Sequence, residues 1–115
     1  MRIIEVNDRT STLINELLEV WEDSVKATHL FLSNEEIENI KRYVPKALNG
    51  VEHLIIIENE SYQPIAFMGI EAKKLEMLFI KNSERGKGLG KHLLNYGIEN
   101  YNVNELAVID IIKIK

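Results

Sequence analysis

The sequence predicts a mixed α/β domain in which a central sheet is flanked by helices. Residues 75–80 form an apolar run that leads through a glycine-rich turn into an amphipathic helix ending near Tyr101. Before this run, residues 53–70 hold two further apolar runs separated by a turn, whereas residues 1–45 mostly show helical spacing. We expect residues 1–115 to form one domain.

The first part of the chain predicts one strand and two helices. Residues 1–7 alternate loosely as a strand, and Thr10 or Ser11 can cap a helix that ends near Thr28. A second helix is expected over residues 34–44, after a capping box and with a proline disturbing its end.

The middle of the chain predicts an antiparallel meander. Residues 53–58, 65–70 and 75–80 read as strands joined by short connections. The run 75–80 is apolar enough to be buried on both faces of the sheet. Residues 103–109 should form a fifth strand parallel to 75–80, because a helix crosses between the two.

Composition excludes several function classes. The formal net charge of -4 argues against a nucleic-acid partner. The absence of cysteine excludes thiol nucleophiles, disulfides and zinc–thiolate sites. No apolar run is long enough to cross a membrane, and no signal peptide is visible. We therefore expect a cytoplasmic protein with no metal site and no membrane partner.

The glycine-rich turn has the properties of a phosphate site. Gly86, Gly88 and Gly90 leave the main chain bare, so its N–H groups can converge on an anion. The following helix would point its free N–H groups and positive dipole end at the same place. A Walker A loop is excluded by spacing and by His92 at the hydroxyl position, and the dinucleotide fingerprint is one residue short.

Arg85, Gly88 and Gly90 instead match the pattern Arg-x-x-Gly-x-Gly, and the flanking strand and helix fit it as well. In this the chain resembles the GNAT superfamily of N-acetyltransferases, where the pattern binds acyl-CoA. The resemblance implies a GNAT-like fold with a mixed central sheet, and acetyl-CoA as co-substrate. The alternative is an ordinary glycine-rich connection between a strand and a helix.

The family's binding mode implies a set of cofactor residues. Pantetheine would pair along the strand, and the pyrophosphate would lie in the turn with two lysines as auxiliary cations. The implied residues are Met77, Leu78, Phe79, Ile80, Arg85, Gly86, Lys87, Gly88, Leu89, Gly90 and Lys91.

The resemblance also implies an acceptor wall where the first two helices meet. Trp21, His29 and Phe31 resemble a pattern found there in one bacterial branch of the family. Core packing is the favoured alternative for Trp21 and Phe31, and His29 could equally be a capping or loop residue. Amines, amino acids, aminoglycosides and protein N-termini all stay open as acceptors.

The implied reaction is direct attack of a primary amine on the thioester, which needs no covalent intermediate and no metal. Holding both reactants together supplies much of the rate. A free backbone N–H near Leu78 or Phe79 would stabilise the oxyanion, and Glu76 is the candidate base. The alternative for Glu76 is a place on the far face, or an ion pair with a lysine.

The resemblance covers residues 1–108, and residues 109–115 are an atypical tail. A GNAT chain would continue into a fourth helix, which usually carries a tyrosine that protonates the leaving thiolate, and two more strands. We expect a truncated fold without these elements, with slow or absent turnover. The alternatives are therefore a CoA-binding pseudoenzyme or an interaction domain. Apolar residues within 103–114 would favour a homodimer or higher oligomer.

Overall fold

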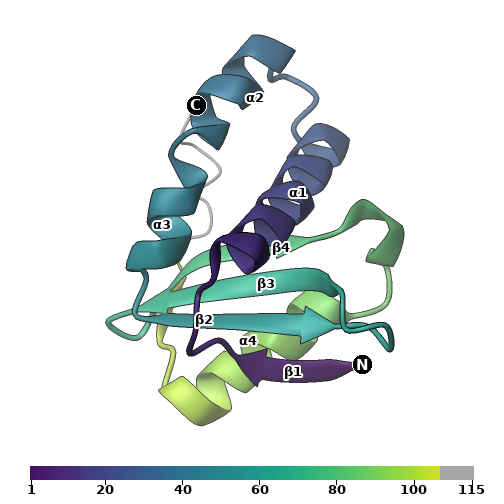
Figure 1. Cartoon of the computed structure of the whole chain (residues 1–115). Helices are drawn as coiled ribbons and strands as arrows, with labels where there is room; N and C mark the ends of the chain where they lie inside the picture. Colours follow the sequence, from purple (N-terminus) through teal and green to yellow (C-terminus); the bar gives the residue numbers. More distant parts are fainter. Residues whose placement is uncertain (107–115) are drawn as a thin grey trace.

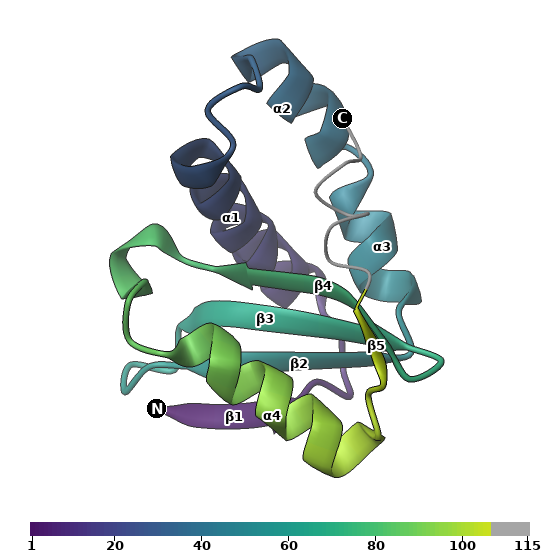
Figure 2. The same ribbon diagram turned by 180° about the vertical axis from the view of Figure 1, so that it is seen from behind.

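The computed structural model describes residues 1–106, which form a mixed five-stranded sheet with helices on both of its faces (Figures 1 and 2). In spatial order the strands are β1 (Arg2–Glu5), β2 (His53–Glu58), β3 (Pro64–Glu71), β4 (Lys74–Ile80) and β5 (Glu105–Leu106). Neighbours from β1 to β4 are antiparallel, and β5 runs parallel to β4. The predicted meander and the parallel fifth strand are confirmed. Residues 107–109 of the predicted fifth strand, and the atypical tail, lie outside the described residues.

In the described residues, α-helices lie on both faces of the sheet (Figures 1 and 2). On the first face lie α1 (Ser11–Thr28), α2 (Asn34–Lys41) and α3 (Val44–Gly50), and on the second lies α4 (Leu89–Tyr101). The N-caps of α1 and α2 lie where the sequence predicts them. The Thr10 hydroxyl accepts from the N–H of Leu13 at 3.1 Å, and Ser33 and Glu36 form the expected capping box.

The prediction of one helix over residues 34–44 was wrong. The first helix of this stretch, α2, ends at Lys41, and a separate helix, α3, begins at Val44. Pro45 occupies the first turn of α3, where its missing N–H costs no hydrogen bond and its fixed φ suits a helix. The proline therefore starts a helix instead of ending one.

Two apolar cores lie on the two faces of the sheet. Between the sheet and the first three helices, Leu17, Trp21 and Phe67 are buried together with side chains of β4. Between the sheet and α4, the core includes Met68 and Leu93. Removal of these side chains from water is the main force that holds the helices on the sheet.

The prediction that residues 75–80 are buried on both faces holds only in part. Burial alternates along β4, with Leu75, Met77 and Phe79 buried and the residues between them only half-buried. Met77 and Phe79 pack against α1, whereas Leu75 is buried on the α4 side, where Leu78 and Ile80 are covered only in part. The half-covered side of β4 is the place where the glycine turn begins.

Candidate functional site

The glycine turn leaves a series of N–H groups unpaired at the start of α4. Gly86 and Gly88 both have φ of 78°, a left-handed conformation that favours glycine, and Gly88 is the N-cap of α4. The first N–H of this helix to bond is that of His92, which donates to the carbonyl of Gly88 at 3.0 Å. Within residues 1–106, the N–H groups of residues 86–91 donate to no atom. This is the arrangement that binds an anion at a helix N-terminus.

Cationic side chains surround the turn. The guanidinium of Arg85 is exposed and has no partner in the described part of the chain. Lys91 lines an open hollow of about 380 Å³ along α4, together with Gly88 and His92. The ammonium of Lys87 lies 3.1 Å from the carboxylate of Glu84, so part of its charge is already compensated. This ion pair between Lys87 and Glu84 was not predicted from the sequence.

The outer edge of β4 is open next to the turn. β5 pairs with β4 only at Lys74 and Leu75, so no described residue pairs with that edge beyond Leu75. The N–H of Lys81 donates to the carbonyl of Ile65 on β3 at 2.9 Å. Because N–H groups alternate in an antiparallel ladder, those of Leu78 and Ile80 point to the open edge. The N–H of Phe79 points toward β3, so of the two expected oxyanion donors only Leu78 has a suitable direction.

Glu76 is the extra residue of a β-bulge. Gly69 of β3 lies opposite Met77 and Ile70 lies opposite Leu75, which leaves Glu76 without a partner residue in the ladder. Its side chain is half-buried and forms no ion pair with a lysine among residues 1–106. The bulge reverses the facing of the strand, which explains why Leu75 packs in the α4 core whereas Met77 and Phe79 pack against α1.

A small apolar hollow lies on the α1 side of β4. It measures about 70 Å³. Its lining residues are Trp21, Ile40, Tyr43, Val44, Ala47, Met77 and Phe79. Trp21 is only 4% exposed, so it packs in the core and also borders the hollow. Sequence reasoning did not single out these lining residues from Ile40 to Ala47 as part of a site, and Val44 and Ala47 lie on α3, which was not anticipated.

His29 and Phe31 lie together at the end of α1, and neither lines this hollow. His29 is the C-cap of α1, and its Nδ1 lies 2.8 Å from the hydroxyl of Thr28. The ring of Phe31 is 62% exposed and meets that of His29 edge-on at 5.7 Å. Of the three residues expected at the acceptor wall, Trp21 lines this hollow together with Met77 and Phe79 of β4.

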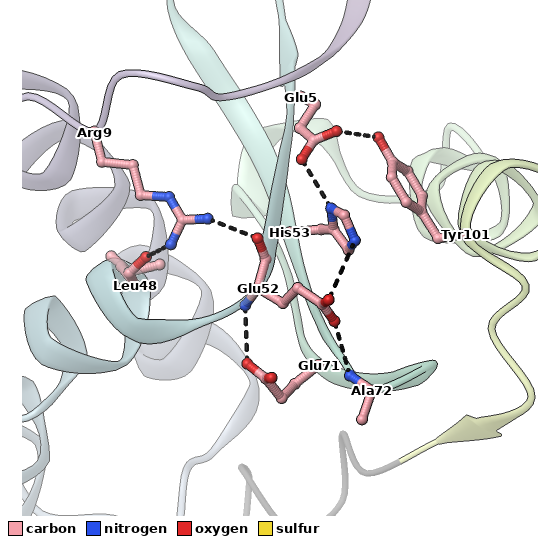
Figure 3. Close-up of polar contacts among 8 residues, drawn as sticks. All are labelled: Glu5, Arg9, Leu48, Glu52, His53, Glu71, Ala72 and Tyr101. Atoms are coloured by element: carbon pink, nitrogen blue, oxygen red, sulfur yellow. Dashed lines mark hydrogen bonds and ion pairs between the residues drawn. The ribbon is translucent and has the colours of Figure 1, made fainter.

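A second polar cluster, which the sequence did not indicate, lies at the other end of α4 (Figure 3). The carboxylate of Glu5 accepts from the Tyr101 hydroxyl at 2.6 Å and from Nδ1 of His53 at 2.8 Å. The hydrogen bond from His53, followed by that from Tyr101, lowers the pKa of Glu5. Burial, together with the bond to Glu5, raises the pKa of Tyr101. These groups are satisfied by one another.

Residues 1–106 contain neither a metal-binding cluster of side chains nor a membrane-spanning helix. No three histidine, aspartate or glutamate side chains gather there in a way that could hold a metal ion. None of the helices in this part of the chain combines the length and apolarity needed to span a membrane.

Comparison with known proteins places this geometry in a family. No family model matches the chain. It is 36% identical over 99 residues to the peptidyl-lysine N-acetyltransferase YjaB of Escherichia coli, covering 78% of this chain and 64% of that protein. The solution structure of apo YjaB from Escherichia coli is 32% identical, with a TM-score of 0.72 over 86% of this chain and 66% of that chain. The chain belongs to the GNAT superfamily of N-acetyltransferases.

The GNAT fold extends to more distant structures. A GNAT family acetyltransferase from Brucella melitensis, solved in complex with acetyl-CoA, has a TM-score of 0.61 at 15% identity, over 88% of this chain and 69% of that chain. The expected fold class is thereby confirmed. The chain spans 64% of the length of the curated relatives that it matches.

Proposed function

We propose that this GNAT chain transfers the acetyl group of acetyl-CoA to a primary amine, and that the amine is a lysine side chain of a protein. The observation that supports it best is the row of unpaired N–H groups at residues 86–91, directly beside the open edge of β4. The lysine acceptor is suggested by the name of the relatives, peptidyl-lysine N-acetyltransferase.

In this proposal the cofactor lies across the turn and along the strand. The pyrophosphate accepts from the free N–H groups of the turn, with Arg85, Lys87 and Lys91 supplying positive charge. Pantetheine pairs along residues 77–80 as an added strand. The outward N–H of Leu78 donates to the thioester oxygen as charge develops there.

The acceptor approaches from the α1 side, where the apolar hollow beside Trp21 suits the aliphatic stem of a lysine. Glu76, free of any lysine partner in residues 1–106, takes the ammonium proton directly or through a water. The amine nitrogen then bonds to the thioester carbon and the carbon–sulfur bond breaks. Coenzyme A leaves as a thiolate, and the second proton that the nitrogen loses on forming the amide reaches this thiolate through water.

The first test is calorimetric titration with acetyl-CoA. We expect micromolar binding by the parent and at least a hundredfold loss in the double variant Gly88→Glu, Gly90→Glu, because two carboxylates would occupy the anion site. Gly50→Glu is the matched control, since Gly50 has open space around it and lies on α3, away from the turn. Equal binding by all three proteins would contradict the proposal.

Turnover is tested separately, by thiol release with a lysine-containing peptide and with free small amines. Release that is faster with the peptide supports a protein acceptor. Cofactor binding without release from any amine would support the alternative of a CoA-binding pseudoenzyme. The predicted oligomer and the predicted cytoplasmic location stay predictions, and light scattering tests the first of them.

A further inference from the structure

We propose that Asp23 is a positioning residue for the glycine turn, and that through it α1 controls the affinity of the cofactor site. Asp23 Oδ2 accepts a hydrogen bond from the backbone N–H of Asn82 at 2.6 Å, across 59 residues of sequence. The inference rests on the proposed function, because it assumes that the turn binds the pyrophosphate of acetyl-CoA.

Asn82 is the last residue before the turn whose N–H is held from outside the segment. Lys81 is held by β3 through the carbonyl of Ile65, and Asn82 by Asp23. Asn82 also begins the short 3₁₀ helix η1 (Asn82–Glu84). At the end of this helix, the N–H of Arg85 donates to the carbonyl of Asn82 at 3.2 Å. A shift of Asn82 is therefore passed directly to Arg85 and the turn.

Beyond Asn82 the main chain has little else to hold it. From residue 83 to residue 92, N–H groups donate only to the carbonyls of Lys81, Asn82 and Gly88 or to no described atom. An anion site made of backbone N–H groups works only if those groups converge, so the segment must be held at its start. Leu89, which is buried, holds the far end.

The same helix borders both proposed sites. Asp23 is two residues from Trp21, whose ring lines the apolar hollow on the acceptor side. Since α1 is a continuous helix from Ser11 to Thr28, a displacement of its Trp21 segment by an acceptor would move Asp23 and the turn with it. The bond from Asp23 to Asn82 thus joins the helix that borders the hollow to the start of the glycine turn.

Charge and geometry predict opposite results for the conservative variant. A carboxylate near the turn repels a pyrophosphate, so Asp23 would weaken cofactor binding if its charge were what mattered. A positioning role needs only an acceptor oxygen, which the amide of asparagine also provides. Asp23→Asn should therefore keep the affinity, whereas Asp23→Ala should lose it.

The experiment compares Asp23→Ala, Asp23→Asn and the matched control Glu22→Ala. Glu22 is the adjacent acid on α1, but it pairs with Lys41 at 2.7 Å and Lys26 at 3.0 Å instead of the turn. Amide hydrogen exchange at residues 82 and 85 is measured without cofactor, and acetyl-CoA affinity is then measured by calorimetry. Thermal unfolding confirms that each variant is folded.

For Asp23→Ala we expect at least tenfold faster exchange at both amides and at least a fivefold weaker affinity. Asp23→Asn and Glu22→Ala should stay within twofold of the parent in both measurements. The inference is overturned if Asp23→Ala binds like the parent, if Asp23→Asn is as weak as Asp23→Ala, or if Glu22→Ala causes the same loss. If the parent itself does not bind acetyl-CoA, the proposed function fails, and the exchange rates alone still decide whether Asp23 holds the turn.

Discussion

The two ends of α4 hold their polar groups in different ways. At the carboxyl end, Tyr101, His53 and Glu5 bond to one another in a half-buried cluster (Figure 3). At the amino end, the N–H groups of residues 86–91 have no partner within residues 1–106. Both ends carry charged side chains and lie against the same sheet, so amino-acid composition alone does not show which end is a binding site.

The difference teaches how to separate a structural polar cluster from a binding site. A cluster whose donors and acceptors are matched contributes to the stability of the fold and has little left to offer a ligand. A set of unpaired donors contributes nothing to folding and is available for binding. The comparison therefore predicts that changes at one end affect stability without affinity, whereas changes at the other end affect mainly affinity.

The largest stability effect is expected from Glu5→Ala. It removes the charged acceptor of two hydrogen bonds, which leaves the Tyr101 hydroxyl without that acceptor and His53 with only its 3.9 Å contact to Glu52, so the free energy of unfolding should fall by about 2 to 3 kcal/mol. Urea unfolding measures it. Glu58→Ala, which loses the solvent-exposed pair with Arg2, is the control and should lose clearly less stability, because solvent screens such a pair. A change in the acetyl-CoA affinity of Glu5→Ala would contradict the distinction between a structural cluster at one end of α4 and a binding site at the other.

Tyr101→Phe should have a smaller effect of the same kind. The ring and its contacts with His53 and Tyr96 remain, and only the hydroxyl that donates to Glu5 is lost. We expect a loss of about 1 to 1.5 kcal/mol in the free energy of unfolding, with cofactor affinity unchanged. If the variant is as stable as the parent, the hydrogen bond from Tyr101 to Glu5 contributes nothing to the stability of the fold.

Gly88→Ala should lower the affinity for acetyl-CoA more than it lowers the stability of the fold. The φ of 78° places an added Cβ in a left-handed conformation, although there is open space around it, so stability should fall by about 1 kcal/mol. Acetyl-CoA affinity should fall by at least tenfold, because relief of the strain turns the first N–H groups of α4 away from the anion. Calorimetry and urea unfolding measure the two effects on one protein sample. An unchanged affinity would show that the turn is only a connection.

The smallest effect is expected from mild acid. Hydrogen bonds from His53 and Tyr101 hold the pKa of Glu5 below its ordinary value, so the folded state keeps the charged form in preference. This contribution is complete above the ordinary glutamate pKa of about 4.3, and is lost as the pH falls toward the lowered pKa of the folded state. The stability difference between the parent and Glu5→Gln should therefore be constant near pH 7 and shrink below pH of about 4. A difference that grows in acid would contradict the assignment.

Much of the fold could be predicted, because its signals are local. The strand from His53 to Glu58 and the capping box at Ser33 follow from residues that lie within a few positions of one another. The turn and the start of α4 were also predictable, since glycine spacing and apolar repeats report local conformation. The extra helix α3 was missed because Pro45 is a signal for the end of one helix and for the start of another.

By itself, the sequence determined the order of strands and helices apart from α3, together with the capping box and the glycine turn, since each depends on residues close together in the chain. Only the tertiary structure decided which polar groups are paired. The bonds of Glu5 reach 48 and 96 residues along the chain, and that of Asp23 reaches 59. The bulge at Glu76 and the outward N–H of Leu78 depend on the register between β3 and β4. Such contacts exist only once the sheet has assembled, because strand register and helix packing bring distant residues together.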